Sequence, residues 1–232
     1  MIYSDLYFKQ KQKISIGLII IAFFLSFVIF ISIFKGAKIE SRASKSDLKR
    51  IEITNLNPIQ TTIFWQTETK ETGWLIYGEK ENILDKIVFD DRDLTTSQNK
   101  YLNHYVTLKN LKNDTTYYFM IISDNKKIIR PDGKYFSFRT PKTISNLTKL
   151  PPISGKILNE NLTPLNSGVV LFSIKAKNLY SLSFLLKSSG EWLIPLNSFY
   201  KKDDINEVVI GENDKATIEI FNEDGKKTNI DW

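Results

Sequence analysis

The pattern of apolar and polar residues divides the chain into one long apolar segment and a series of short alternating segments. Ile14 to Phe34 runs without a charged residue, a proline or a polar side chain larger than serine. At about 1.5 Å rise per residue, a helix of this length spans roughly 30 Å, the hydrocarbon thickness of a bilayer. The segment is therefore predicted to be a transmembrane helix, with a cleaved signal peptide and a buried core helix as the two alternatives.

From Ile51 onward, apolar residues alternate with polar ones over short runs, which is typical of half-buried β-strands. Turn-forming residues such as Pro131-Asp132-Gly133 separate these runs. We expect strands that together form a small antiparallel sandwich over residues 51–141. The predicted strands cover 51–56, 61–67, 74–78, 101–108, 116–123 and 135–140.

A second series of β segments follows a proline-bounded polar stretch, which is interpreted as a linker. Its predicted strands lie within 153–161, 164–172, 188–196 and 215–221. The expected organisation is a short cytoplasmic tail (1–13), a transmembrane helix (14–34), a charged spacer (35–50), a first β-sandwich (51–141), a linker (142–152) and a second β domain (153–232).

The formal net charge of +6 comes from the residues around the apolar segment. Residues 1–50 hold nine Lys and Arg against three Asp and Glu, whereas the remaining 182 residues hold 23 of each sign. This excess suits anionic lipid headgroups, so no nucleic-acid partner is expected. Lysines before the segment favour a cytoplasmic N-terminus, and the more numerous basic residues after it favour the reverse. We expect the β domains to be extracytoplasmic, because large domains translocate largely regardless of charge.

Candidate chemistry is sparse. Cysteine is absent and His104 is the single histidine, so thiolate chemistry and multi-histidine metal centres are excluded. The chain has no glycine-rich phosphate loop and no nucleophile elbow. The charged runs 90–93 and 201–204 are interpreted as solvated loops, with a Ca²⁺ site as the alternative. No catalytic residue, cofactor or metal site is predicted, and the protein is not expected to be an enzyme.

One residue pattern extends over the predicted first sandwich. It reads Trp65-x-Thr67, Tyr77-Gly78, His104-x-Val106-x-Leu108-x-x-Leu111-x-x-x-Thr115-x-Tyr117-x-Phe119 and Phe136-x-Phe138-x-Thr140. This pattern resembles a fibronectin type III domain, and it looks closest to the variant that precedes the catalytic domain in purple acid phosphatases. The resemblance implies structural roles for Trp65, His104 and Tyr117, with the Tyr117 hydroxyl bonded to nearby backbone in a tyrosine corner. It implies no metallophosphatase centre here, because one histidine cannot supply the ligands.

A looser pattern occupies 153–200. It reads Gly155-x-Ile157, Pro164-Leu165-x-x-Gly168-Val169-Val170-Leu171 and Ser189-Gly190-x-Trp192-x-Ile194. This order is similar to carboxypeptidase regulatory-like or transthyretin-like domains, and the similarity implies a spacer or adhesion-type module. In the first domain, Trp74 is expected on the face opposite the core, where it is a candidate for binding a sugar ring or a partner side chain. Packing against a neighbouring domain or loop is the alternative.

The predicted fold class is therefore mainly β, with an N-terminal transmembrane helix, a fibronectin type III-like β-sandwich and a second small β-sandwich. The predicted function is that of a single-pass, non-catalytic protein of a bacterial cell surface, presenting these domains for protein or glycan binding or as a scaffold. Its expected partners are the lipid bilayer, through Ile14–Phe34, and a protein or glycan. The alternative is an accessory subunit or degenerate relative of a membrane-tethered hydrolase that lacks the catalytic domain, and the chain as a fragment is a third possibility.

Overall fold

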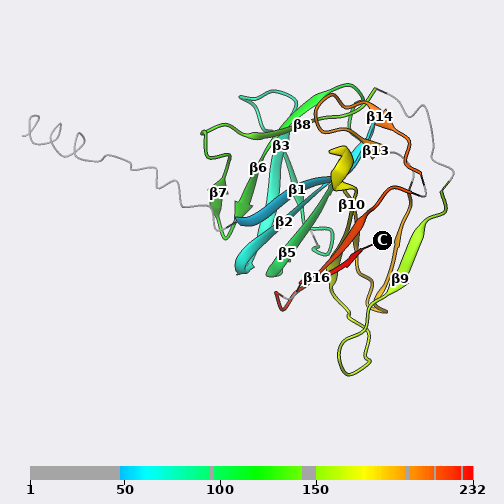
Figure 1. The fold of residues 1–232 in the computed structure, drawn as a ribbon. Coiled ribbons are helices and arrows are strands. Elements are labelled where there is room, and N and C mark those ends of the chain that lie inside the picture. The colour runs from blue at the N-terminus through cyan, green and yellow to red at the C-terminus, as the bar shows by residue number, and fades with distance from the viewer. Residues whose placement is uncertain are drawn as a thin grey trace, which may run out of the picture. The chain divides into compact units, whose positions relative to one another are not determined.

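The computed structural model describes residues 48–94, 97–142, 150–196, 199–211, 213–225 and 227–231 (Figure 1). Within these ranges the chain is mainly β, and its one helical element is the three-residue 3-10 helix Lys175–Lys177. The predicted transmembrane helix and cytoplasmic tail lie outside the described residues. A search of the described residues for a helix long and apolar enough to cross a membrane finds none.

The first module is a sandwich of two antiparallel sheets. One sheet has the order β1–β2–β5, and the other has the order β4–β3–β6–β7 with β8 also paired to β6. Their bounds are β1 Leu48–Asn57, β2 Gln60–Glu71, β3 Gly73–Gly78, β4 Lys86–Phe89, β5 Tyr101–Leu108, β6 Thr116–Ser123, β7 Lys126–Ile128 and β8 Phe136–Arg139. Side chains that alternate inward from both sheets form its core, among them Trp65, Leu75, Val106 and Phe119.

Each strand predicted for this module is present, but β4 and β7 are additional and β1 is longer than expected. β1 begins at Leu48, inside the predicted charged spacer, and Leu48 pairs with Thr67 on β2. The spacer was misjudged because Lys49 and Arg50 resemble linker charge, whereas Lys49 forms an ion pair with Glu68 across the strands. β4 and β7 have four and three residues, which is too short to show a period.

The second module contains a four-stranded antiparallel sheet of order β11–β10–β15–β16 and two two-stranded ribbons, β9–β12 and β13–β14. The bounds are β9 Ile153–Lys156, β10 Gly168–Ser173, β11 Leu182–Leu185, β12 Glu191–Ile194, β13 Phe199–Tyr200, β14 Glu207–Val208, β15 Thr217–Asn222 and β16 Lys227–Asp231. Its core includes Phe172, Trp192, Ile194 and Ile218. β9 pairs with β12, and β10 pairs with β11 and β15. The strands β11, β13, β14 and β16 lie outside the predicted segments.

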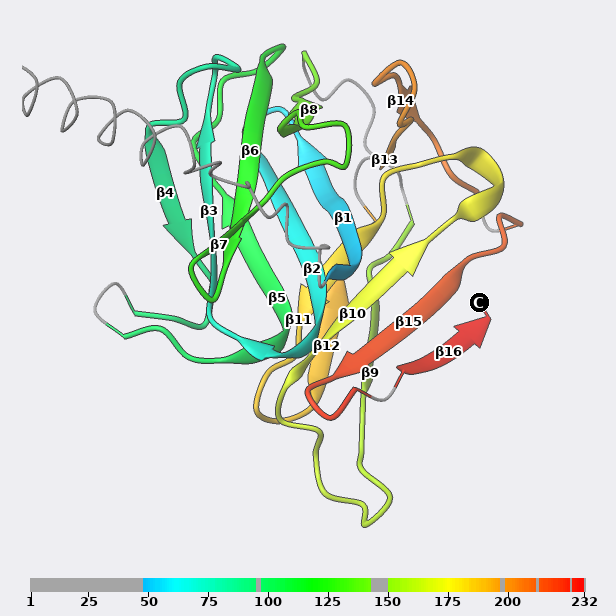
Figure 2. The same ribbon diagram turned by 90° about the vertical axis from the view of Figure 1, so that its left-hand side faces the viewer.

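Strands β5 and β10 explain how the two modules meet. On β5, Val106 faces the first core while Tyr105 lies in a separate apolar cluster with Val169 of β10. On β10, Val170 faces the second core. Both strands are buried on both faces, so the β1–β2–β5 sheet is covered by the first core on one side and by the β10 sheet on the other (Figure 2).

Candidate functional site

The contact between the modules is apolar at its centre. Phe64 of β2 and Tyr105 of β5 pack against Val169 and Leu171 of β10 and Phe221 of β15. The rings of Phe64 and Phe221 lie 5.2 Å apart, centroid to centroid, and are tilted by 47°. Each of these side chains is at most 7% exposed. Such burial stabilises the contact by about 1.5–3 kcal/mol for each fully covered large apolar side chain.

A buried carboxylate stands at one end of this apolar centre. Glu219 of β15 is 2% exposed, and its oxygens accept hydrogen bonds from Arg50 of β1 at 2.7 and 3.2 Å. Lys227 of β16 forms an ion pair with the same carboxylate at 2.5 Å. Burial alone would raise the pKa of Glu219, but the hydrogen bonds from Arg50 and Lys227 lower that pKa to about 2. Arg50 also donates a hydrogen bond to Glu52 on its own strand, so its guanidinium binds one carboxylate from each module.

Hydroxyl and amide groups join β1 to β11 beside the apolar centre. Ser183 donates its backbone N–H to the side-chain oxygen of Asn55 at 2.8 Å, and the Asn55 amide nitrogen donates to the Ser183 hydroxyl at 2.9 Å. The hydroxyls of Thr54 and Ser183 lie 2.6 Å apart, and the Tyr105 hydroxyl donates to the Ser183 carbonyl at 3.2 Å. These contacts fix the register of the two sheets, because each polar group needs its own partner once it is buried.

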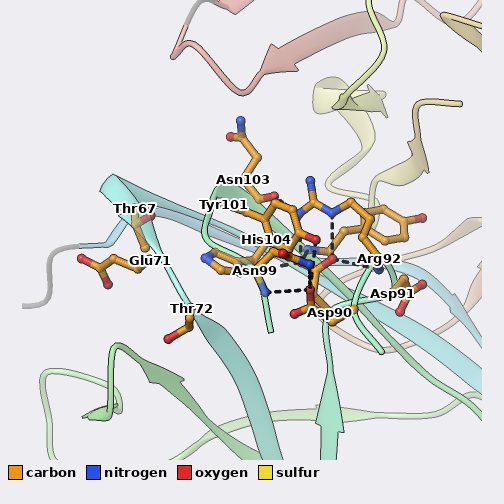
Figure 3. A network of polar contacts seen from close by, with 12 residues as sticks. Thr67, Glu71, Thr72, Asp90, Asp91, Arg92, Asn99, Tyr101, Asn103 and His104 are labelled. Carbon is orange, nitrogen blue, oxygen red and sulfur yellow. Dashed lines mark hydrogen bonds and ion pairs between the residues drawn. The ribbon is translucent and has the colours of Figure 1, made fainter. Parts of the chain in front are cut away.

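A second charged network closes the other end of the contact (Figure 3). Asp90, directly after β4, has a fully buried side chain that accepts two hydrogen bonds from the Arg92 guanidinium, at 2.8 and 2.9 Å. The backbone N–H of Tyr105 donates to Asp90 at 2.9 Å. Burial alone would raise the pKa of the Asp90 carboxyl, but these hydrogen bonds, led by those from Arg92, lower that pKa to about 2.

Arg92 carries this network across to the second module. Its guanidinium donates to Glu223, in the turn after β15, at 2.9 Å, and to the Asn103 carbonyl at 2.5 Å. The other Glu223 oxygen accepts the backbone N–H of Leu102 at 2.8 Å. The guanidinium carbon lies 3.5 Å from the ring centroid of Tyr101, within cation–π range. One side chain thus holds Asp90 of the first module and Glu223 of the second.

His104 lies inside the first module, beside this network. Its ring is fully buried and stacks on Trp65 with centroids 4.5 Å apart and planes 7° from parallel. Nδ1 is 3.6 Å from the nearest Asp90 oxygen, which exceeds hydrogen-bond length, and neither ring nitrogen has a hydrogen-bond partner among the described residues. A Cβ added at Gly73 would lie 2.7 Å from both rings. The packing around His104 and Trp65 therefore leaves room only for glycine at that position.

The remaining predicted site residues lie apart from the networks. Tyr117 is buried in the first core, and its hydroxyl accepts the backbone N–H of Lys112 at 2.9 Å, a tyrosine-corner geometry. Trp74 lies on the face of β3 opposite the buried Leu75, where it is partly exposed and its ring sits 6.3 Å from that of Phe89 on β4. Its role in binding a partner stays a prediction.

The prediction that the charged run 90–93 is a solvated loop was wrong for its first residue, Asp90. Asp90 is 2% exposed, because the chain turns inward there to meet Arg92 two residues later. Arg92, Glu219 and Glu223 were not singled out, since the pairs that join the modules are far apart along the chain. Arg92 and Glu223 are 131 residues apart, and Arg50 and Glu219 are 169 residues apart. Among the described residues, no group of three or more His, Asp or Glu side chains could hold a metal ion. The described networks are suited to fastening one module to the other.

Comparison with known proteins bears on the first module. Residues 49–140 match the family described as "Purple acid Phosphatase, N-terminal domain". Residues 49–140 are a fibronectin type III-like domain. The match concerns the domain that precedes the catalytic one, and the family comparison indicates no catalytic domain. A search of curated proteins found no match. The similarity of 153–200 to carboxypeptidase regulatory-like domains stays a prediction.

Two of the solved structures that match have low sequence identity to this chain. The sensor domain of the anti-sigma factor RsgI4 of Pseudobacteroides cellulosolvens is 17% identical, with a TM-score of 0.29, over 42% of this chain and 98% of the sensor domain. The FN1–FN3 domains of chicken CNTN1 are 12% identical, with a TM-score of 0.29, over 79% of this chain and 64% of that chain.

Proposed function

We propose that this protein is a single-pass membrane protein that presents two β modules, held as one rigid body, to a protein or glycan partner, without catalysis of its own. The observation that carries this proposal is the buried contact between the modules. The cation Arg92 spans both modules, Glu219 holds cations from both, and all described residues belong to one compact unit. A fixed arrangement of modules presents a binding surface at low entropic cost. The family match supports the non-catalytic part.

The anchoring part of the proposal rests on Ile14–Phe34, whose length and composition suit a bilayer. We place the N-terminus in the cytoplasm and the modules outside a bacterial cell membrane, at the cell surface. The bilayer is then the first partner of the chain.

Protease accessibility tests this arrangement. The chain would carry a tag near its C-terminus, and intact and lysed cells would be treated in parallel. Digestion of the tag in intact cells is the expected result, and protection until lysis would contradict the placement at the cell surface. Deletion of residues 14–34 should also release the chain from the carbonate-washed membrane fraction. Retention of that variant would contradict the anchor.

A second function is favoured by the family match alone. A match to the N-terminal domain of a phosphatase family fits an accessory subunit or a degenerate relative of a membrane-tethered hydrolase. A neighbouring gene for a metallophosphatase would support this alternative. Neighbouring genes for surface or secretion proteins would support the presenting role.

A further inference from the structure

An open cleft lies where the edges of the first sandwich meet the second module. Its volume is about 490 Å³. Ile51 and Ile53 of β1 line one wall, Phe136 of β8 lines another, and Tyr180 comes from the segment before β11. Arg130 and Lys202 stand on its rim, one from each module. Each of the four apolar or aromatic side chains is half-buried, so a ligand in the cleft would cover apolar surface that is now partly in water.

The edge of β1 beside the cleft already pairs with another segment of the chain at one end. β1 is the outer strand of its sheet, so its far edge has no partner within that sheet. Asn55 donates its backbone N–H across this edge to the Ser181 carbonyl at 3.0 Å, and Thr54 and Ser181 form a parallel bridge. Backbone groups of alternate residues point to the same edge, so those of Ile53 and Ile51 point the same way. Among the described residues, no strand continues this pairing beside Ile51.

The charges around the cleft favour an acidic ligand. Lys202 has an exposed ammonium with no ion-pair partner among the described residues, and Arg130 is paired only with the half-exposed Asp132, at 3.0 Å. The carboxylate of Glu52, the acid that lines the cleft, already accepts hydrogen bonds from Arg50 and Ser181. A carboxylate on the ligand would therefore find a free cation at the rim, at a charge-assisted hydrogen-bond distance of about 2.8 Å.

We propose that this cleft binds an extended acidic peptide segment of a partner protein, which adds as a strand to the free edge of β1. The peptide backbone would pair with Ile51 and Ile53 and extend the pairing begun by Ser181. Alternate side chains would enter the apolar cleft, and an Asp or Glu would reach Lys202. The inference rests on the proposed function as a protein-binding module and names the class of partner.

A displayed library of linear ten-residue peptides tests the proposal, panned against the full chain in detergent micelles. The enriched peptides should have an apolar residue at every second position and at least one Asp or Glu. Fluorescence anisotropy of a synthetic version should show about tenfold weaker binding to the Lys202→Glu variant, the loss of one charge-assisted hydrogen bond. Lys215→Glu is the matched control, since Lys215 is exposed and lies outside the cleft, and its affinity should stay within about twofold.

Two peptide series test the backbone pairing without altering the protein. N-methylation of every second amide should abolish binding in the series whose methyl groups face β1, and leave it nearly unchanged in the other, because only one set of amides meets the strand. Equal binding by both series, equal affinity for Lys202→Glu, or failure of any acidic peptide to enrich would overturn the proposal. Dimerisation that protects the Ile51 amide from exchange would give the edge to a second copy and overturn it equally.

Because binding is measured on the purified chain, the outcome does not depend on the side of the membrane that the modules occupy. A peptide bound in the cleft by a chain whose tag is protected in intact cells would overturn the cell-surface placement alone. An exposed tag without any peptide binding would overturn the cleft proposal alone.

Discussion

Replacement of Arg92 by methionine should loosen the contact between the modules more than any neighbouring surface change. Methionine keeps the length of the aliphatic stem, so the substitution chiefly removes the guanidinium. In the native protein that group bonds Asp90, Glu223 and the Asn103 carbonyl and lies on the Tyr101 ring. Arg92→Met therefore leaves one fully buried carboxylate and one mostly buried carboxylate without their cation.

The cost follows from the burial of these groups. Removing one partner of a buried ion pair costs about 3–5 kcal/mol, since the remaining charge stays desolvated. Asp90 retains the backbone N–H of Tyr105, and Glu223 retains that of Leu102, which places the expected cost near the lower limit. We expect Arg92→Met to lower the free energy of unfolding by about 3 kcal/mol. Asp90→Asn in addition should recover part of this loss, because the double variant buries one unpaired charge fewer.

Urea unfolding of the full chain in mild detergent, followed by tryptophan fluorescence, measures these differences. Trp65 is a suitable reporter because it is fully buried and stacked on His104, next to the network. The four proteins of the Asp90–Arg92 double-mutant cycle should give a coupling energy of about 1–3 kcal/mol. Lys215→Met, at an exposed position, is the control and should change stability by less than about 0.5 kcal/mol. A cost below about 1 kcal/mol for Arg92→Met, or no coupling, would refute the reasoning.

Three further predictions concern stability. The pKa of the Asp90 carboxyl is about 2 in the native protein, below its unfolded value, so this carboxyl stabilises the fold above about pH 4 and ceases to do so as the pH falls toward 2. In acid titrations followed by circular dichroism, the free energy of unfolding of Asp90→Asn should therefore fall by roughly 2 kcal/mol less than that of the native protein over this pH range. Tyr117→Phe should cost about 1 kcal/mol in urea unfolding, through the Lys112 hydrogen bond; an unchanged midpoint would contradict its structural role. Gly73→Ala should overpack the core, lower the free energy of unfolding by about 1–3 kcal/mol and so lower the melting midpoint. Gly211→Ala, whose added methyl group would meet no neighbouring atom, should leave the midpoint unchanged.

The sequence predicted what depends on local pattern. Alternation identified the strands that carry Trp65, Leu75 and Val106, and the family resemblance around Tyr117 indicated the sandwich type. Period two shows which residues share a face. It does not show whether the opposite face meets water or a second sheet, and at Tyr105 it meets a second sheet.

The charged networks were out of reach for the same reason. Asp90 stands in a run of charges that resembles a loop, and its burial depends on Tyr105 and Arg92 turning toward it. Glu219 sits in an apolar strand, where a charge at a buried position signals a partner, but nothing local identifies Arg50 as that partner. Contacts of this kind are set by the packing of one module on the other, which only the three-dimensional arrangement reveals.

The absence of cysteine allows a direct measurement of whether the modules move as one body. Spin labels would be attached to cysteines placed at two exposed positions, Lys127 on β7 of the first module and Lys187 after β11 of the second. Double electron–electron resonance on the full chain should give one narrow distance distribution, which broadens when Arg92→Met and Glu219→Gln are introduced together. A broad distribution in the otherwise native protein would contradict the rigid pair of modules on which the proposed function depends.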